Sequence, residues 1–257
     1  MDKSRSPGRR RALKQRLESL ASAGVTSRPK RRGTQSRPAG RDRAAVEPAA
    51  AAPVAPQAIV PTPHPVAGAA ARGRALDVLR AEVAACRLCA PLAAARTNTV
   101  FGTGSATARL CFLGEAPGAD EDASGEPFVG RAGQLLTKII EACTLSRDEV
   151  YILNVLKCRP PDNRPPLPGE TANCRGYFEK QLEIIAPEFI CCLGTTASQA
   201  LLQTDETIGK LRKRWFSWRS SQVICTYHPS YLLRNPPAKR DVWDDMKLLM
   251  AKMGVRI

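Results

Sequence analysis

Two polar segments, far apart in the sequence, each follow an apolar run and contain residue types that bind ligands. The first begins at Gly114, after apolar residues 110–113, and continues to Gly130. The second, residues 228–234, follows apolar residues 223–225. We interpret each segment as a loop at the carboxyl end of a buried strand, where open α/β sheets bind their ligands. The pattern therefore predicts a ligand site at that edge of a sheet.

Four of the 9 cysteines form a pattern that suits a metal–thiolate centre. Cys86 and Cys89 form a C-x-x-C pair, and Cys158 and Cys174 are separated by 15 residues of proline-rich loop and helix start. Four thiolates in a reducing compartment fit either tetrahedral zinc or a cubane iron–sulfur cluster, and the spacing does not separate the two. The other cysteines lie in apolar strands or on helix faces, where free cysteine is usually a small buried hydrophobe, so we assign them to the core: Cys111, Cys143, Cys191, Cys192 and Cys225.

A third segment, residues 154–161 with the sequence Asn-Val-Leu-Lys-Cys-Arg-Pro-Pro, lies between the first two. In spelling and in order, the three segments and the four cysteines closely resemble the family 4 uracil-DNA glycosylases, which carry an iron–sulfur cluster. The resemblance extends from residue 83 or so to residue 250. It implies a monofunctional hydrolase that cleaves the N-glycosidic bond of deoxyuridine in DNA, with water as the nucleophile, and leaves an abasic site for base excision repair. It also implies a structural [4Fe–4S] cluster held by the four patterned cysteines: Cys86, Cys89, Cys158 and Cys174.

The resemblance assigns the recognition of uracil to three residues. An enzyme that acts on a base must take it out of the duplex, stack it and bind its edge. Phe128 offers a π face for stacking, and a core phenylalanine is the alternative. The side-chain amide of Asn154 complements uracil O4 and N3–H and opposes the edge of cytosine, and a turn residue is the alternative. His228, otherwise a structural histidine, would donate to uracil O2 and stabilise negative charge on the departing base, so it and Asn154 are the expected catalytic residues.

Glu115 and Glu121 are the candidate carboxylates of the pocket. In the better-known glycosylases of this fold, an aspartate that helps to position water stands at the place of Ala116, so this chain lacks that carboxylate. The resemblance places Glu115 beside the pocket as a catalytic residue that orients water or the loop backbone, with Ala116 against the substrate. Glu121 would help to shape the C5 side of uracil against thymine, and we interpret Asp122 as a surface or helix-capping residue.

Residues 231–234 are expected to face the DNA. Leu232 lies at the position of the family's intercalating residue, an apolar side chain that fills the space left by a flipped nucleotide. Arg234 would bind a phosphate, whereas Leu233 would pack in the core. Further positive charge along the DNA phosphates would come from three basic residues near the pocket: Lys157, Arg159 and Arg164.

Two other functions compete with the glycosylase interpretation. The first is a uracil-DNA binder that traps its product covalently, but relatives of that kind insert a basic, histidine-bearing loop after the strand of Asn154. No histidine occurs between Cys158 and Cys174, which argues against this interpretation. The second is a non-catalytic metal–thiolate DNA-binding module, which would leave the combination of Phe128, Asn154 and His228 unexplained.

The elements that must position these residues alternate between strand and helix along the chain. Apolar residues at 132, 135, 136, 139, 140 and 143 recur at helical spacing, which predicts an amphipathic helix. Further helices are expected at 75–85, 170–186, 195–202 and 239–253, and strands at 109–113, 150–156, 189–193, 215–218 and 222–227. This alternation predicts a single three-layer α/β/α domain with a mainly parallel central sheet, of the uracil-DNA glycosylase type.

The positive charge is concentrated near the N-terminus. Residues 1–75 contain 16 Lys and Arg against 4 Asp and Glu, a net charge of +12, whereas residues 76–257 contain 23 against 20, a net charge of +3. Residues 1–74 contain too few large apolar side chains to offset the entropy of ordering, so we expect a disordered basic arm and Ala/Pro-rich linker before a glycosylase domain at 75–257. The arm would act either as a non-specific DNA tether or as a solubilising tail, and a repair or replication partner is a further candidate ligand for it.

The composition also limits the compartment. No stretch approaches the ~20 apolar residues that a membrane-spanning helix needs, and no apolar signal core follows the N-terminus. An odd number of cysteines favours reduced thiols over a disulfide framework. We therefore expect a cytoplasmic, nucleoid-associated monomer that binds uracil-containing DNA and no membrane. An organelle transit peptide is the alternative for the Arg- and Ser-rich start, although Asp2 and the Ala/Pro run weaken it.

Overall fold

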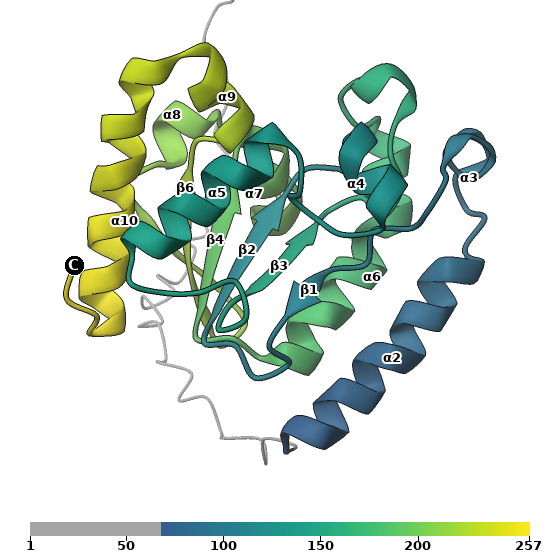
Figure 1. The fold of residues 1–257 in the computed structure, drawn as a ribbon, viewed down its shortest axis with the longest axis horizontal. Helices are drawn as coiled ribbons and strands as arrows, with labels where there is room; N and C mark the ends of the chain where they lie inside the picture. The colour runs from purple at the N-terminus through teal and green to yellow at the C-terminus, as the bar shows by residue number, and fades with distance from the viewer. Residues whose placement is uncertain (1–67) are drawn as a thin grey trace, which may run out of the picture. The chain divides into compact units, whose positions relative to one another are not determined.

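A six-stranded sheet forms the middle layer of the structure, a computed structural model that describes residues 68–257. The strands are β1 (Thr103–Gly104), β2 (Leu110–Gly114), β3 (Tyr151–Asn154), β4 (Phe189–Leu193), β5 (Trp215–Trp218) and β6 (Ser221–Thr226). Their order is β1-β3-β2-β4-β6-β5, in which the four central strands are parallel and the two edge strands are antiparallel (Figure 1). The predicted mainly parallel sheet is confirmed.

The central strands are apolar throughout because both faces of the sheet are covered. All five residues of β2 and all five of β4 are buried, which is typical of strands in the middle of a parallel sheet. Successive side chains point to opposite faces, so Leu113 belongs to one hydrophobic core and Phe112 to the other. The fold is therefore a three-layer α/β/α sandwich with a core on each side of the sheet.

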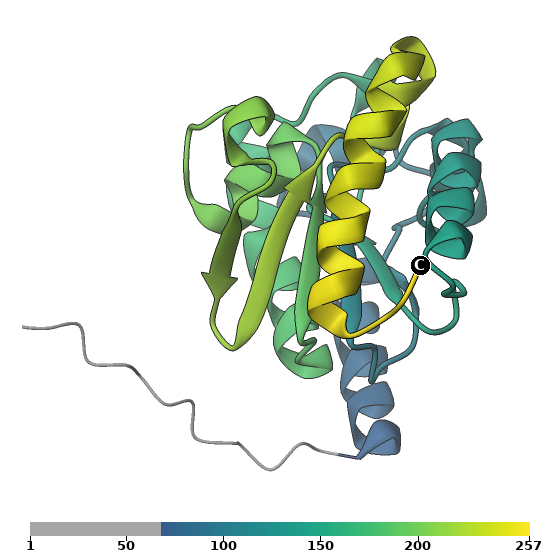
Figure 2. The same ribbon diagram turned by 90° about the vertical axis from the view of Figure 1, so that its left-hand side faces the viewer.

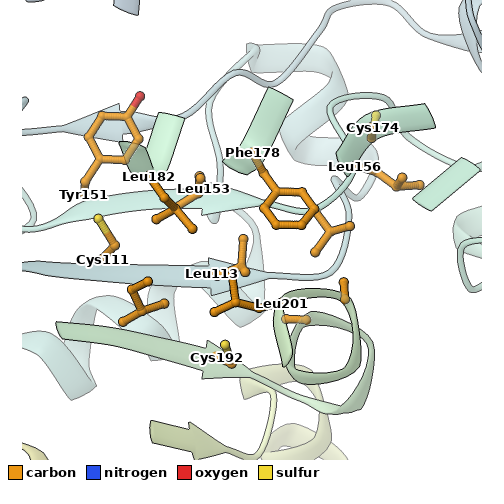
Figure 3. Packing of buried hydrophobic residues seen from close by; sticks show 14 of the residues in the cluster. Cys111, Leu113, Tyr151, Leu153, Leu156, Cys174, Phe178, Leu182, Cys192 and Leu201 are labelled. Carbon is orange, nitrogen blue, oxygen red and sulfur yellow. The ribbon is translucent and has the colours of Figure 1, made fainter. Parts of the chain in front are cut away.

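The first core lies between the sheet and α2 (Ala69–Ala85), α3 (Ala90–Ala95), α6 (Pro168–Ile185), α7 (Thr195–Leu202) and α8 (Ile208–Leu211). Helices α2 and α6 lie side by side on this face (Figure 1). Figure 3 shows Phe178 and Leu182 of α6 directed toward Leu113 and Leu153 of the sheet. Because Cys174 belongs to the same core, α6 connects the hydrophobic interior with the cysteine pattern.

The second core lies between the opposite face of the sheet and α5 (Arg131–Ala142), α9 (Pro229–Arg234) and α10 (Lys239–Met253). Figure 2 shows α10, in yellow, running along the sheet with β5 and β6 to one side and α5 to the other. The amphipathic pattern predicted for residues 132–143 is confirmed, because Leu136 and Ile140 of α5 are fully buried. The short α9 packs on α5, and this contact fixes the direction of the loop that follows β6.

The observed elements extend the predicted set in several places. Helix α2 begins at Ala69, earlier than the predicted start at residue 75, and the buried guanidinium of Arg72 donates to the carbonyl of Ile185. The folded domain therefore includes residues that we had assigned to the arm. Unpredicted elements are α3, α8, α9, β1, α4 (Ala119–Ser124), η1 (Pro161–Asn163) and η2 (Pro236–Ala238).

The predicted disordered arm lies almost wholly outside the described residues. Within residues 68–257, no helix combines the length and apolar character needed to cross a membrane.

Candidate active site and cysteine cavity

The segments singled out in the sequence meet at the carboxyl edge of the parallel strands. Gly114 ends β2 and is the register partner of Asn154, which ends β3. His228 follows β6 and caps the N-terminus of α9. Phe128 comes to the same place from the loop between α4 and α5, because its ring centroid lies 5.6 Å from that of His228. The structure thus brings together the three residues predicted to recognise the base.

Gly114 forms the floor on which two of these side chains lie. A Cβ atom at this position would be 2.3 Å from Asn154 Oδ1 and 2.5 Å from Phe128 Cζ. Both distances are far below ordinary van der Waals contact, so only glycine allows the Asn154 amide and the Phe128 ring to approach the backbone this closely. The close approach explains why glycine must end the apolar run of β2.

Asn154 has an unsatisfied acceptor at this edge of the sheet. Its side chain is 2% exposed, and among the described residues Oδ1 has no hydrogen-bond partner. A buried polar atom without a partner costs about 1–3 kcal/mol, so such atoms in native proteins call for an explanation. A ligand with an N–H group provides that explanation, and the turn role considered for Asn154 does not.

The loop that carries Phe128 is held by polar contacts behind the ring. Phe128 has a φ of 56°, a left-handed backbone conformation that non-glycine residues adopt rarely. Arg147 Nη2 donates to the carbonyl of Pro127 at 2.9 Å, and its Nη1 donates to the carbonyl of Phe128 at 3.2 Å. The loop is therefore held in a strained conformation. Phe128 is 6% exposed and belongs to the second hydrophobic core, as in the alternative considered for it, and its ring also lies beside that of His228.

Glu121 fastens the same loop from the other side. Its Oε1 accepts the backbone N–H groups of Val129 at 3.0 Å and Gly130 at 2.9 Å, and its Oε2 accepts that of Gly118 at 3.0 Å. The structure thus assigns the Glu121 carboxylate to the loop backbone, whereas its contact with the C5 side of a base stays a prediction. Asp122 is not on the surface as expected, because it is 4% exposed and accepts the N–H of Thr97 at 3.0 Å.

His228 is held with one ring nitrogen toward its own helix. The backbone N–H of Ser230 donates to Nδ1 at 3.1 Å, and the Ser230 hydroxyl lies 2.8 Å from the same atom. Burial, together with the positive charge of Arg234, lowers the pKa of His228 to about 4. The ring is therefore neutral near pH 7, and because Nδ1 is an acceptor, the proton resides on Nε2.

Glu115 is held by a residue that we had not predicted. The hydroxyl of Thr196, in the first turn of α7, donates to Glu115 Oε2 at 2.6 Å. Ala116 follows it and packs partly buried against the first core. The carboxylate therefore has a fixed direction at the strand edge. The sequence signal was the Gly-Thr-Thr start of a helix directly after β4, at the same edge of the sheet.

The prediction that Leu232 faces the DNA is wrong for this conformation. Leu232 is 1% exposed and packs in the second core, whereas Leu233, which we had assigned to the core, is 38% exposed. A short helix replaces the expected loop and turns Leu232 toward α5 and α10. Arg234 is exposed at the end of α9, as its predicted phosphate contact requires.

Three further basic residues were predicted to lie along the DNA phosphates, and the structure places one of them in the interior. Lys157 is 1% exposed, and its Nζ donates to the carbonyl of Asn154 at 2.7 Å and to that of Phe101 at 3.3 Å. Burial lowers the pKa of Lys157 to about 7. The residue supports the end of β3 from inside, so its predicted role at the DNA surface is wrong. Arg164 is tied to Glu170 by a salt bridge at 2.6 Å, and Arg159 lies partly buried.

The four patterned cysteines line one small cavity between α3, α6 and the loop after β3: Cys86, Cys89, Cys158 and Cys174. The remaining five are buried in the two cores, as predicted. Within the described part of the chain, no three His, Cys, Asp or Glu side chains converge closely enough to hold a single metal ion. The four patterned thiols thus share one cavity.

Two polar side chains donate hydrogen bonds to cysteine sulfur atoms in this cavity. Arg96 Nη1 donates to Cys158 Sγ at 3.0 Å, and Asn173 Nδ2 donates to Cys89 Sγ at 3.4 Å. Burial raises the pKa of Cys174 to about 11, opposed by the backbone N–H of Lys157, which donates to the same thiol. Uncharged thiols would not need a guanidinium among them, so the donor set suits a centre that bears negative charge.

The fold and site are those of one superfamily. Residues 101–247 match the family model described as "Uracil DNA glycosylase superfamily". A type-4 uracil-DNA glycosylase of Thermotoga maritima is 45% identical over 166 residues, which cover 64% of this chain and 86% of that protein. The type-4 uracil-DNA glycosylase of Archaeoglobus fulgidus is 42% identical over 180 residues, which cover 67% of this chain and 90% of that protein. The chain therefore belongs to the type-4 uracil-DNA glycosylase family.

Proposed function

We propose that the protein is a monofunctional uracil-DNA glycosylase, which hydrolyses the N-glycosidic bond of deoxyuridine in DNA and leaves an abasic site for base excision repair. The single observation that carries this proposal is the buried Oδ1 of Asn154, which has no hydrogen-bond partner among the described residues and lies near the ring of Phe128, itself 5.6 Å from the ring of His228. Family membership supports the same activity.

Base selectivity follows from the direction of the Asn154 amide. Its unpaired Oδ1 accepts the N3–H of uracil, and its amide group donates to O4. Cytosine offers an acceptor at N3 and an amino group at the O4 position, so both contacts become repulsive. Because Oδ1 lies close to Gly114, the end of β2 limits the movement of the amide on that side.

His228 stabilises the departing base. The Ser230 contacts fix the neutral tautomer with the proton on Nε2, which donates to uracil O2 as negative charge develops there. A neutral donor already in position stabilises the transition state without transferring its proton. The ring of Phe128 stacks on the base and excludes water from its face.

Glu115 positions the attacking water. Its Oε2 is occupied by the Thr196 hydroxyl, which leaves Oε1 as the acceptor for a water molecule at the sheet edge. No aspartate is available at Ala116 for this task. The water attacks the sugar carbon and gives up a proton to Glu115 Oε1, while the N-glycosidic bond breaks and its electron pair leaves with uracil. The negative charge on uracil O2 is stabilised by the Nε2–H of His228.

The cysteine cavity suits a [4Fe–4S] cluster, the centre that the resemblance to family 4 implies. All four patterned cysteines line this one cavity, and membership of the type-4 family supports the same assignment. Cys86, Cys89, Cys158 and Cys174 would hold the cluster, and the N–H groups of Arg96 and Asn173 would offset its negative charge. The cluster would connect the α2–α3 segment to the loop after β3 and take no part in the chemistry.

A single assay tests the proposed activity against its rivals. Full-length protein is incubated with a uracil-containing oligonucleotide, a matched thymine oligonucleotide and a matched cytosine oligonucleotide, and abasic sites are then cleaved with alkali. We expect cleavage of the uracil strand alone and free protein after denaturation. Protein that stays covalently attached to DNA would indicate a product-trapping binder, and binding without cleavage would indicate a non-catalytic module.

A further inference from the structure

Helix α9, whose N-terminus is capped by His228, exposes Leu233 and not Leu232, the leucine that the family resemblance places at the DNA. Leu233 is 38% exposed and belongs to neither hydrophobic core, whereas Leu232 is 1% exposed. An apolar side chain in water next to an active site is a candidate contact for a partner molecule.

Leu232 is packed in the protein interior. It lines a cavity between α5 and α10 together with Ile139, Val242 and Met246, and it belongs to the second core. To enter DNA, its side chain would have to leave this core and open the space between the two helices. The packing therefore opposes its use as a wedge.

Tyr231 is exposed to a similar degree as Leu233 but is already engaged. Its ring centroid lies 4.9 Å from that of Tyr227, and its hydroxyl accepts the side-chain N–H of Asn235 at 2.7 Å. Leu233 is thus the apolar side chain of α9 that remains available. Arg234, exposed and adjacent in sequence, supplies positive charge beside it.

The position of Leu233 along the helix suits a flipped nucleotide at His228. Leu233 is five residues beyond His228, which corresponds to a rise of about 7.5 Å along a helix. Two base-pair steps of a duplex span about the same length. The spacing between His228 and Leu233 thus matches two base-pair steps.

We propose that Leu233, and not Leu232, is the apolar wedge that enters the DNA stack when deoxyuridine is flipped out. This inference rests on the proposed glycosylase activity. A wedge fills the gap left in a stacked duplex, and a single strand has no such gap to fill. Removal of the wedge therefore lowers excision from duplex DNA more than excision from single strands.

The test compares single-turnover excision from the same uracil oligonucleotide as a duplex and as a single strand, with full-length protein. For Leu233→Ala we expect the duplex-to-single-strand rate ratio to fall about tenfold, which corresponds to about 1.4 kcal/mol at the transition state. Leu233→Met, which keeps a large apolar side chain, should retain most of the duplex-to-single-strand rate ratio. Leu248→Ala, which removes a similarly exposed leucine on α10, is the matched control and should leave both rates unchanged.

The variant Leu232→Ala tests whether Leu232 or Leu233 enters the DNA stack. We expect it to lower the melting temperature and to keep the rate ratio of the unsubstituted protein. Three results would overturn the role of Leu233 while the proposed activity stands. The first is an unchanged duplex-to-single-strand rate ratio in Leu233→Ala. The second is a reduced ratio in Leu232→Ala at a temperature where that variant is folded, and the third is excision from single strands alone by the unsubstituted protein. Absence of excision from both substrates by the unsubstituted protein would overturn the proposed activity and the wedge with it.

Discussion

Replacement of Gly114 by alanine tests whether the pocket depends on the close approach at its floor. The added Cβ would lie 2.3 Å from Asn154 Oδ1 and 2.5 and 2.7 Å from two ring atoms of Phe128. Ordinary contact begins at 3.4 Å, so the amide oxygen must move by at least 3.4 − 2.3 = 1.1 Å and the ring by 3.4 − 2.5 = 0.9 Å. Both groups proposed to hold uracil are therefore displaced together.

A displacement of about 1 Å at a reacting site lowers the rate by roughly 10²-fold. We expect Gly114→Ala to reduce single-turnover uracil excision by about that factor and to lower the free energy of unfolding by about 1–3 kcal/mol, the usual effect of overpacking. Rates are measured with saturating enzyme, and unfolding is followed by urea titration.

Gly73→Ala is the matched control, because Gly73 lies inside α2 and an added Cβ there meets no atom within 4 Å. This variant should keep its excision rate and gain roughly 0.5–1 kcal/mol of stability from the better helix propensity of alanine. If Gly114→Ala excised uracil within about twofold of the unsubstituted rate, base binding would not depend on the close approach of Asn154 and Phe128 to Gly114. The two side chains would then not hold the base as described.

Four further predictions follow from the site. Cys158→Ser should abolish the visible absorption and most of the iron of anaerobically purified protein, whereas Cys143→Ser should keep both; stoichiometric zinc without iron would contradict the cluster. His228→Ala should lower single-turnover excision by roughly 10²–10³, the range for one donor to a developing anion, with binding to uracil DNA nearly intact. Because the pKa of His228 is lowered to about 4 in the folded state from its ordinary value of 6.5, the unfolded chain binds an extra proton as pH falls through this window; stability should decrease from pH 6.5 toward pH 4 in urea titrations, and His228→Asn should reduce that decrease. Removal of residues 1–67, which hold 14 Lys and Arg against 4 Asp and Glu, should leave excision by saturating enzyme unchanged and make the salt dependence of non-specific DNA binding shallower; an unchanged slope would argue against a DNA tether.

The sheet and the meeting of the site residues could be predicted from sequence because they depend on local patterns. Continuous apolar runs such as β2 and β4 indicate buried parallel strands, and the residue that follows such a run lies at the carboxyl edge wherever the strand sits in the sheet. The convergence of Gly114, Asn154 and His228 follows from that rule, whichever helices cover the faces.

The roles of Leu232 and Lys157 could not be predicted because they depend on packing between distant elements. A leucine pair in a short segment does not show which member faces the protein until the direction of α9 against α5 and α10 is known. A lysine beside arginines looks like surface charge, yet the carbonyls of Phe101 and Asn154 make its burial feasible. Neither the packing of Leu232 nor the carbonyl partners of Lys157 can be recognised from a local sequence pattern.

Only three residues separate Asn154 from Cys158, and this spacing limits how the chain can vary in length. All residues from 151 to 158 are buried, and Lys157 ties the end of β3 to the cysteine cavity through its side chain and its backbone. An inserted residue there would move either the base-binding amide or a thiolate out of place. From residue 161 to 169 the chain is largely exposed and includes the short η1. Insertions and deletions among homologues should therefore fall after residue 160, and an alignment with gaps between positions 154 and 158 would show that the two sites can drift apart.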